Sequence, residues 1–93
     1  MMFDKATKAV KDKRYREAMD IFEVLAENNE ADAQYNIALL LKSGRGKPQN
    51  FTGSLKWAWL ALLGDIEEAE KLVDEIKDMI PEQLVKKIRN EVK

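Results

Sequence analysis

The sequence predicts an all-α fold, and three observations support that prediction. Apolar residues recur three and four positions apart along most of the chain, which is the period of an amphipathic helix. Glycine, proline and paired asparagines fall mainly between these periodic segments. The stretch Leu55–Leu63 is apolar except for Lys56. A helix that is apolar on nearly every side must be covered by other helices, so the rest of the chain is expected to pack around this stretch.

The first two helices are predicted at residues 3–12 and 15–27. The first is too short to be stable alone and needs a partner. Asn28 and Asn29 end the second helix, because asparagine tolerates the left-handed backbone conformation. The apolar face of the second helix follows the i, i+3, i+4, i+7 spacing and consists of Ala18, Ile21, Phe22, Leu25 and Ala26.

The third helix is predicted at residues 31–43, with Tyr35 and Leu39 beside its buried face of Ala33, Ile37, Leu40 and Leu41. Residues 44–49 contain two glycines and a proline and are predicted to form a loop.

Asn50 is a plausible N-cap for the fourth helix, which contains the apolar stretch. Trp57 is predicted to lie in the core, and Trp59 beneath the fifth or sixth helix.

The last two helices are predicted at residues 66–79 and 81–92. Asp65 and Glu68 have the spacing of a capping box for the fifth helix. Pro81 suits the first position of the sixth helix, since its missing N–H would have no partner there. The sixth helix is expected to form a lid over the end of the stack.

The composition excludes several classes of function. The chain of 93 residues has no cysteine and no histidine, which removes disulfides, thiolate metal sites and the commonest general base. A net charge of −1 favours neither nucleic acid nor an anionic membrane as a partner. No catalytic residue, metal ligand or cofactor is predicted. The first residues contain no apolar run typical of a secretory signal, so a cytoplasmic location is expected.

The charges are nevertheless unevenly distributed along the chain. No acidic residue lies between Asp32 and Asp65, whereas acidic residues dominate the segments on either side. One interpretation is that successive helices complement each other electrostatically within the stack. The other is that one of these blocks forms a recognition surface for a charged partner.

The sequence also contains an internal repeat. A shift of 36 residues places Tyr15–Gln34 over Phe51–Glu70 without gaps. Size class or turn chemistry is preserved in five of the aligned pairs: Tyr15 with Phe51, Ala18 with Ser54, Ile21 with Trp57, Asn28 with Gly64 and Ala33 with Ala69. A period of this length is typical of arrays of helix pairs.

Residues 31–64 resemble a Sel-like repeat, a tetratricopeptide-like helix pair with a glycine-containing loop. The matching residues are Ala33, Gly44, Gly46, Asn50, Phe51, Trp57, Ala61 and Gly64. Residues 3–27 resemble the plain tetratricopeptide pair that often precedes such a repeat, and residues 66–92 resemble a helix pair that ends in a capping helix. Ala38 stands where this family usually has glycine.

The resemblance implies a single domain over residues 1–93, built as a right-handed α-solenoid of antiparallel helices that serves as a scaffold for other proteins. The first helix of each pair would line a concave groove. Phe3, Asp4 and Thr7 of the first helix would contribute to that groove. The predicted partner-binding residues in the later helices are Asp32, Tyr35, Asn36, Leu39, Lys42, Lys71 and Glu75.

The first functional hypothesis is therefore that the protein is a non-enzymatic adaptor that binds a protein or peptide. Replacing Tyr35 by Ala together with Leu39 by Ser is expected to abolish partner binding while leaving the fold largely intact. The alternative is a self-associating module that forms a weak homodimer through an exposed Trp59 or the sixth helix. Catalysis would require a pocket that perturbs the carboxylates of residues 67–78, and Gly44-Arg45-Gly46-Lys47 lacks the spacing and the preceding strand of a phosphate loop.

Overall fold

Helix boundaries in this protein follow from its turn residues. The computed structural model describes residues 1–92, which form six helices and contain no strand. They are α1 (Met2–Lys11), α2 (Tyr15–Glu27), α3 (Ala31–Ser43), α4 (Phe51–Leu63), α5 (Glu68–Lys77) and α6 (Glu82–Glu91). The predicted bounds of α2 and α3 are confirmed. Asn29 after α2 has a φ of 65° and Gly44 after α3 a φ of 73°, both left-handed. The Asn50 side chain caps α4 by accepting a hydrogen bond from the Gly53 amide at 2.9 Å.

The prediction for the start of α5 is wrong. Asp65 has a φ of 70° and belongs to the turn that ends α4, where the Ile66 amide donates to the Ala61 carbonyl at 3.0 Å. A residue in that conformation cannot serve as the N-cap, which needs extended backbone geometry. No side-chain cap is formed at this end, and α5 begins at Glu68 and ends at Lys77. Pro81 precedes α6 instead of occupying its first position.

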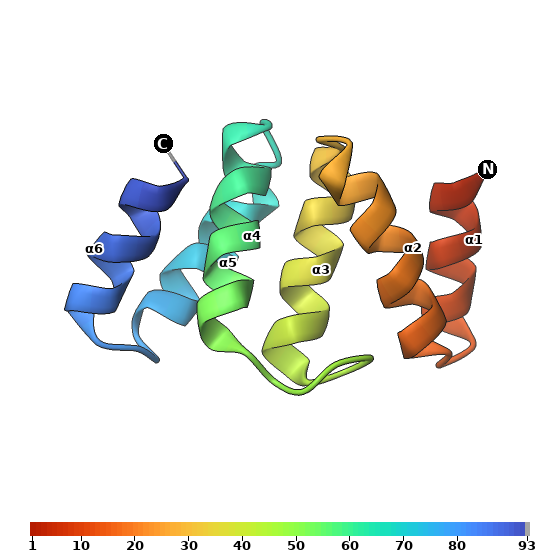
Figure 1. Cartoon of the computed structure of the whole chain (residues 1–93), viewed down its shortest axis with the longest axis horizontal. Coiled ribbons are helices and arrows are strands. Elements are labelled where there is room, and N and C mark those ends of the chain that lie inside the picture. The colour runs from red at the N-terminus through yellow and green to blue at the C-terminus, as the bar shows by residue number, and fades with distance from the viewer. Residues whose placement is uncertain (93) are drawn as a thin grey trace.

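The helices follow one another across the molecule in chain order, and the two termini lie at opposite ends (Figure 1). Each helix from α1 to α4 packs against the next one, while α6 packs mainly on α4. The α4 helix therefore contacts α3, α5 and α6, which explains why its sequence is apolar on nearly every side. The α2 and α4 helices are equal in length and begin 36 residues apart, which matches the internal repeat.

Two apolar cores lie along this array. The first core joins α1, α2 and one side of α3, and the second joins α4, α5, α6 and Ala38 of α3. Ala38 is fully buried, and its carbonyl accepts a hydrogen bond from the Ser54 hydroxyl of α4 at 2.6 Å. The small side chains at this crossing allow α3 and α4 to approach closely. The first core consists of Ala6, Ala9, Ala18, Met19, Phe22, Leu25, Ala26, Ala33, Ile37, Leu40 and Leu41.

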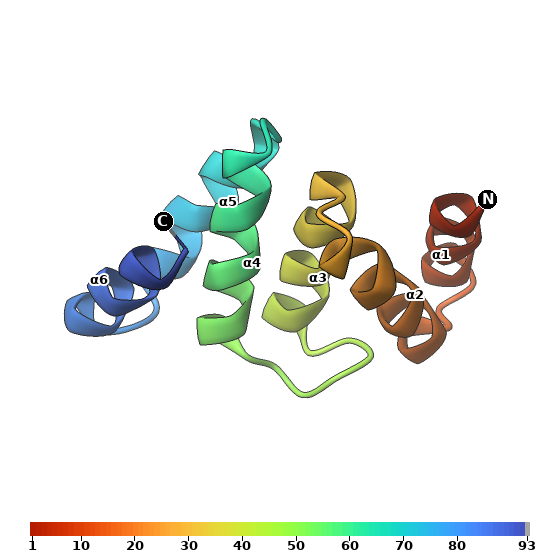
Figure 2. The same ribbon diagram turned by 45° about the horizontal axis from the view of Figure 1, so that its top comes forward.

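The loop between α3 and α4 extends beneath the array towards α2 (Figure 2). Gly46 sits so close to the start of α2 that a Cβ there would lie 2.7 Å from the Tyr15 carbonyl oxygen. The Lys47 ammonium also forms an ion pair with Glu23 of α2 at 2.7 Å. These contacts fix the loop against α2 and bring Arg45 and Lys47 near the start of that helix.

Candidate partner-binding surface

The α3 and α5 helices bring several of the predicted binding residues together. Tyr35, Leu39 and Lys42 follow a spacing of four and then three positions, which places them on one face of α3. That face and α5 enclose a hollow of about 230 Å³. Its lining residues are Tyr35, Leu39, Lys42, Glu68, Lys71, Leu72 and Glu75.

An ion pair crosses this hollow. The Lys42 ammonium of α3 donates a hydrogen bond to the Glu75 carboxylate of α5. This hydrogen bond and the positive charge of Lys42 lower the pKa of Glu75, and Lys71 adds a smaller effect in the same direction. Both lysines therefore stabilise the charged form of the Glu75 carboxylate. The pair ties two helices together, and both of its members remain partly accessible to a ligand.

A second hollow lies on the other side of α3, towards α1 and α2. It has a volume of about 410 Å³. Leu39 and Lys42 line both hollows, so the two adjoin, and together we call them the groove over α1, α3 and α5. The second hollow is lined by Val10, Tyr15, Asn36, Leu39, Leu40, Lys42, Ser43 and Arg45.

The residues of the groove differ in how far a partner can reach them. Leu39 is 38% exposed, a large value for a leucine in the middle of a helix. Tyr35 is half-buried and packs against the second core. Asn36 is half-buried, and its side chain donates to the Asp32 carbonyl at 2.8 Å. Asp32 is exposed but lines neither hollow. Leu39 is therefore the most accessible apolar contact of the predicted set.

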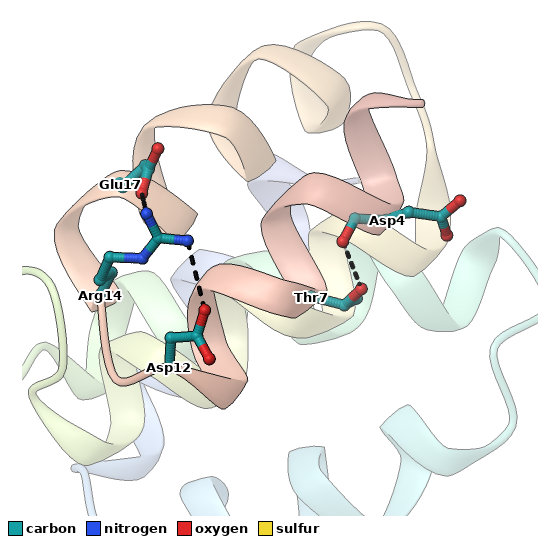
Figure 3. A network of polar contacts seen from close by, with 5 residues as sticks. All are labelled: Asp4, Thr7, Asp12, Arg14 and Glu17. Carbon is teal, nitrogen blue, oxygen red and sulfur yellow. Dashed lines mark hydrogen bonds and ion pairs between the residues drawn. The ribbon is translucent and has the colours of Figure 1, made fainter.

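The three residues expected from α1, Phe3, Asp4 and Thr7, line neither hollow. Phe3 does not line the groove, because its ring packs edge-on against Phe22 in the first core, with 5.7 Å between ring centroids. Thr7 is exposed and donates to the Asp4 carbonyl one turn earlier at 2.9 Å (Figure 3). Val10 is the α1 residue that reaches the groove.

Tyr15 and Arg45 are among the groove residues that sequence reasoning missed. The Arg45 guanidinium lies over the Tyr15 ring, 5.1 Å from its centroid, which is within the range of a cation–π interaction. Tyr15 belongs to α2 and Arg45 to the α3–α4 loop. A pattern of helical periodicity does not show how far a loop folds back, so nothing in the sequence signalled this contact.

The two tryptophans of α4 have different environments. Trp59 is 9% exposed and belongs to the second core, as predicted, with the Arg89 guanidinium of α6 at 5.9 Å from its ring centroid. The exposed Trp59 that the homodimer hypothesis invoked is not found. Trp57, expected to be the central core residue, is half-buried and packs against both cores.

Residues 1–92 contain no cluster of three or more carboxylates suited to a metal ion. None of the helices in that range is long and apolar enough to cross a membrane.

None of the protein-family models, curated proteins and solved structures compared with this chain matches it. The fold and the groove are therefore the basis for assigning a function to this protein.

Proposed function

We propose that this protein is a non-enzymatic adaptor: a right-handed Sel-like, tetratricopeptide-like solenoid whose groove over α1, α3 and α5 binds a peptide or a segment of another protein. The observation that carries the proposal is the position of Leu39. It lies exposed between two adjoining hollows, with Lys42, Asn36 and Lys71 around it. An apolar contact within a polar rim is the usual composition of a peptide-binding surface.

The size of the groove sets the expected affinity. Hollows of about 410 and 230 Å³ have room for a few side chains of a ligand. An interface this small lies at the low end of specific protein–protein interfaces, so we expect a dissociation constant of roughly micromolar.

The carboxylates of α5 favour binding over catalysis. Among residues 1–92, Glu75 is the carboxyl whose pKa is clearly shifted, and the shift is downwards. A general acid at neutral pH needs a raised pKa, which usually comes from burial or from a second carboxylate. Glu75 instead sits beside Lys42 in an open hollow.

The proposal is tested with a displayed library of random peptides selected on the immobilised protein. Peptides that enrich are then titrated into the wild type and into Leu39→Gln. Glutamine keeps the helix propensity of leucine and removes the apolar contact. The loss of one apolar anchor is expected to weaken binding at least about tenfold. Tyr35 is left unchanged because it also supports the second core.

Val24→Gln is the matched control. Val24 is also an exposed apolar residue in mid-helix, 47% accessible, but it belongs to α2 and lines neither hollow. This variant should bind the selected peptides as the wild type does. Amide chemical shifts of the labelled protein should change along α1, α3 and α5. Failure to enrich any peptide, or shifts confined to α4 and α6, would contradict the proposal.

A further inference from the structure

Positively charged side chains cluster where the α1–α2 turn lies beside the α3–α4 loop. An open hollow of about 690 Å³ lies there beside the groove, and Tyr15 lines both. Its cationic lining residues are Lys13, Arg14, Arg16 and Lys47. Arg45 lies on the groove side of Tyr15 and extends this positive surface to Lys42.

Some of these charges are already neutralised. The Arg14 guanidinium forms ion pairs with Asp12 at 3.4 Å and with Glu17 at 3.1 Å (Figure 3). Lys47 is paired with Glu23.

The other three cations, Lys13, Arg16 and Arg45, have no ion-pair partner within residues 1–92. We call these three the basic rim. They come from three different segments: the α1–α2 turn, α2 and the α3–α4 loop.

The surroundings of Arg45 in the basic rim restrict its motion before any ligand binds. Arg45 rests on the Tyr15 ring, and Gly46 packs against the Tyr15 carbonyl. The Gln49 side chain donates to the Lys42 carbonyl at 2.8 Å and ties the far part of the loop back to α3. A cation held in place in this way loses less conformational entropy on binding than one on a free loop.

We propose that the groove binds an acidic peptide segment, with side-chain carboxylates on the basic rim and an apolar side chain against Leu39 and Val10. This inference depends on the proposed function, because it assigns the chemistry of the peptide that the groove receives. Three unpaired cations on separate segments fit several carboxylates along a chain better than one terminal carboxylate. Charge complementarity of this kind sets partner choice and association rate.

A nucleic acid fits this surface less well. Binding of single strands usually needs aromatic faces on which bases stack. One face of the Tyr15 ring is already covered by Arg45. Tyr35, the other aromatic residue that lines the groove, is half-buried against the second core. The floor of the groove beside Tyr15 is aliphatic, formed by Val10, Leu39 and Leu40.

Fluorescence anisotropy with two labelled, C-terminally amidated peptides tests the inference. One alternates glutamate and leucine, and the other has glutamine in place of every glutamate. Amidation removes the terminal carboxylate, so only side-chain charges differ. The glutamate peptide should bind at least about tenfold more tightly at low ionic strength, and this advantage should shrink as salt is added. Equal affinity for the two peptides would overturn the inference.

Two variants locate the site. Arg16→Gln with Arg45→Gln should weaken binding of the glutamate peptide about fivefold, the order expected for two exposed charge contacts. Lys13→Gln with Arg16→Gln should have a similar effect while keeping the Arg45–Tyr15 contact. The control is Lys56→Gln with Lys87→Gln, which removes the same charge from exposed positions on α4 and α6. A control that weakens binding as much as the rim variants would overturn the assignment.

The outcomes separate this inference from the proposed function. If both peptides bind equally and Leu39→Gln removes both, the groove is a peptide site and the acidic preference is wrong. If neither peptide nor any library peptide binds, the proposed function itself fails. Single-stranded oligouridylate is the probe for nucleic acid. The inference would be overturned in favour of nucleic acid if this probe bound more tightly than the glutamate peptide and the rim substitutions weakened its binding.

Discussion

At the scale of single residues, Glu75 connects the groove to the stability of the fold. Its ion pair with Lys42 joins α3 to α5, two helices that otherwise touch over a small area. The pair lowers the pKa of Glu75 below its value in an unfolded chain. A carboxyl whose pKa is lowered by folding stabilises the folded state at any pH above its unfolded value. That contribution is lost as the pH falls through the unfolded value, about 4.3, towards the folded one.

Glu75→Gln should therefore lower the urea midpoint at pH 7 and leave it nearly unchanged at pH 3. The difference from the wild type should disappear as the pH falls, because the wild-type carboxyl then becomes neutral too. Lys42→Met should give the same convergence with the wild type, because it removes the partner that lowers the pKa. A midpoint difference that stays constant from pH 7 to pH 3 would show that the ion pair does not contribute to stability.

The residues of the candidate site were predictable where they depend on helical periodicity. Tyr35, Leu39 and Lys42 share a face because of their spacing, and the ion pair between Lys42 and α5 follows from the packing of that face. Arg45 was not predictable, since its place over Tyr15 depends on the path of the α3–α4 loop. Phe3 was misassigned because the family resemblance placed it in the groove, whereas its spacing puts it on the same apolar face as the buried Ala6 and Ala9.

At the scale of elements, the sequence specifies helix ends where a turn residue has one clear role. Asn29 and Gly44 take left-handed conformations, and the helices before them end as predicted. Asp65 could be interpreted in two ways, as a cap for α5 or as the end of α4. The packing of α4 against α3 selects the second, because it places Gly64 directly against the first residue of α3.

This contact makes Gly64 sensitive to substitution. A Cβ at Gly64 would lie 2.5 Å from the Cβ of Ala31, far inside van der Waals contact. Gly64→Ala should therefore push the end of α4 away from the start of α3 and lower the free energy of unfolding by about 1–3 kcal/mol, the usual cost of overpacking. Urea denaturation followed by circular dichroism would measure the change.

A compensating substitution tests whether steric overlap is the cause. Ala31→Gly removes the opposing methyl group and should itself cost up to about 1 kcal/mol through reduced helix propensity. The double variant should then be clearly more stable than the sum of the two single effects predicts, because Ala31→Gly makes room for the methyl group that Gly64→Ala adds. Strictly additive effects would mean that the cost of Gly64→Ala arises elsewhere, for example in the backbone of the turn.

At the scale of the whole molecule, the presence of two cores raises the question of whether they unfold together. How far two cores unfold together depends on the free energy of the interface between them. Here α3 and α4 form that interface. Trp57 is half-buried on α4 and contacts both cores, while Trp59 on the same helix belongs to the second core alone. Trp57 therefore joins the two cores, although its side chain is only half-buried.

The position of Trp57 predicts that Trp57→Ala will uncouple the two cores as well as destabilise the fold. The loss should be about 2–3 kcal/mol, somewhat below the range for a fully buried aromatic residue. In this variant Trp59 is the only tryptophan and reports on the second core, whereas far-ultraviolet circular dichroism reports on all six helices. The fluorescence and circular dichroism transitions should have different urea midpoints, because the weakened interface no longer forces both cores to unfold together.

Trp57→Phe is the matched control, since it also leaves Trp59 as the single tryptophan but keeps an aromatic ring between the cores. Its fluorescence and circular dichroism transitions should coincide. If they also coincide in Trp57→Ala, the coupling is carried by the rest of the α3–α4 contact, where Ser54 bonds to Ala38, and the tryptophan contributes only its own burial. In that case Ser54→Ala, which removes the hydrogen bond without opening a large cavity, becomes the substitution expected to separate the two transitions.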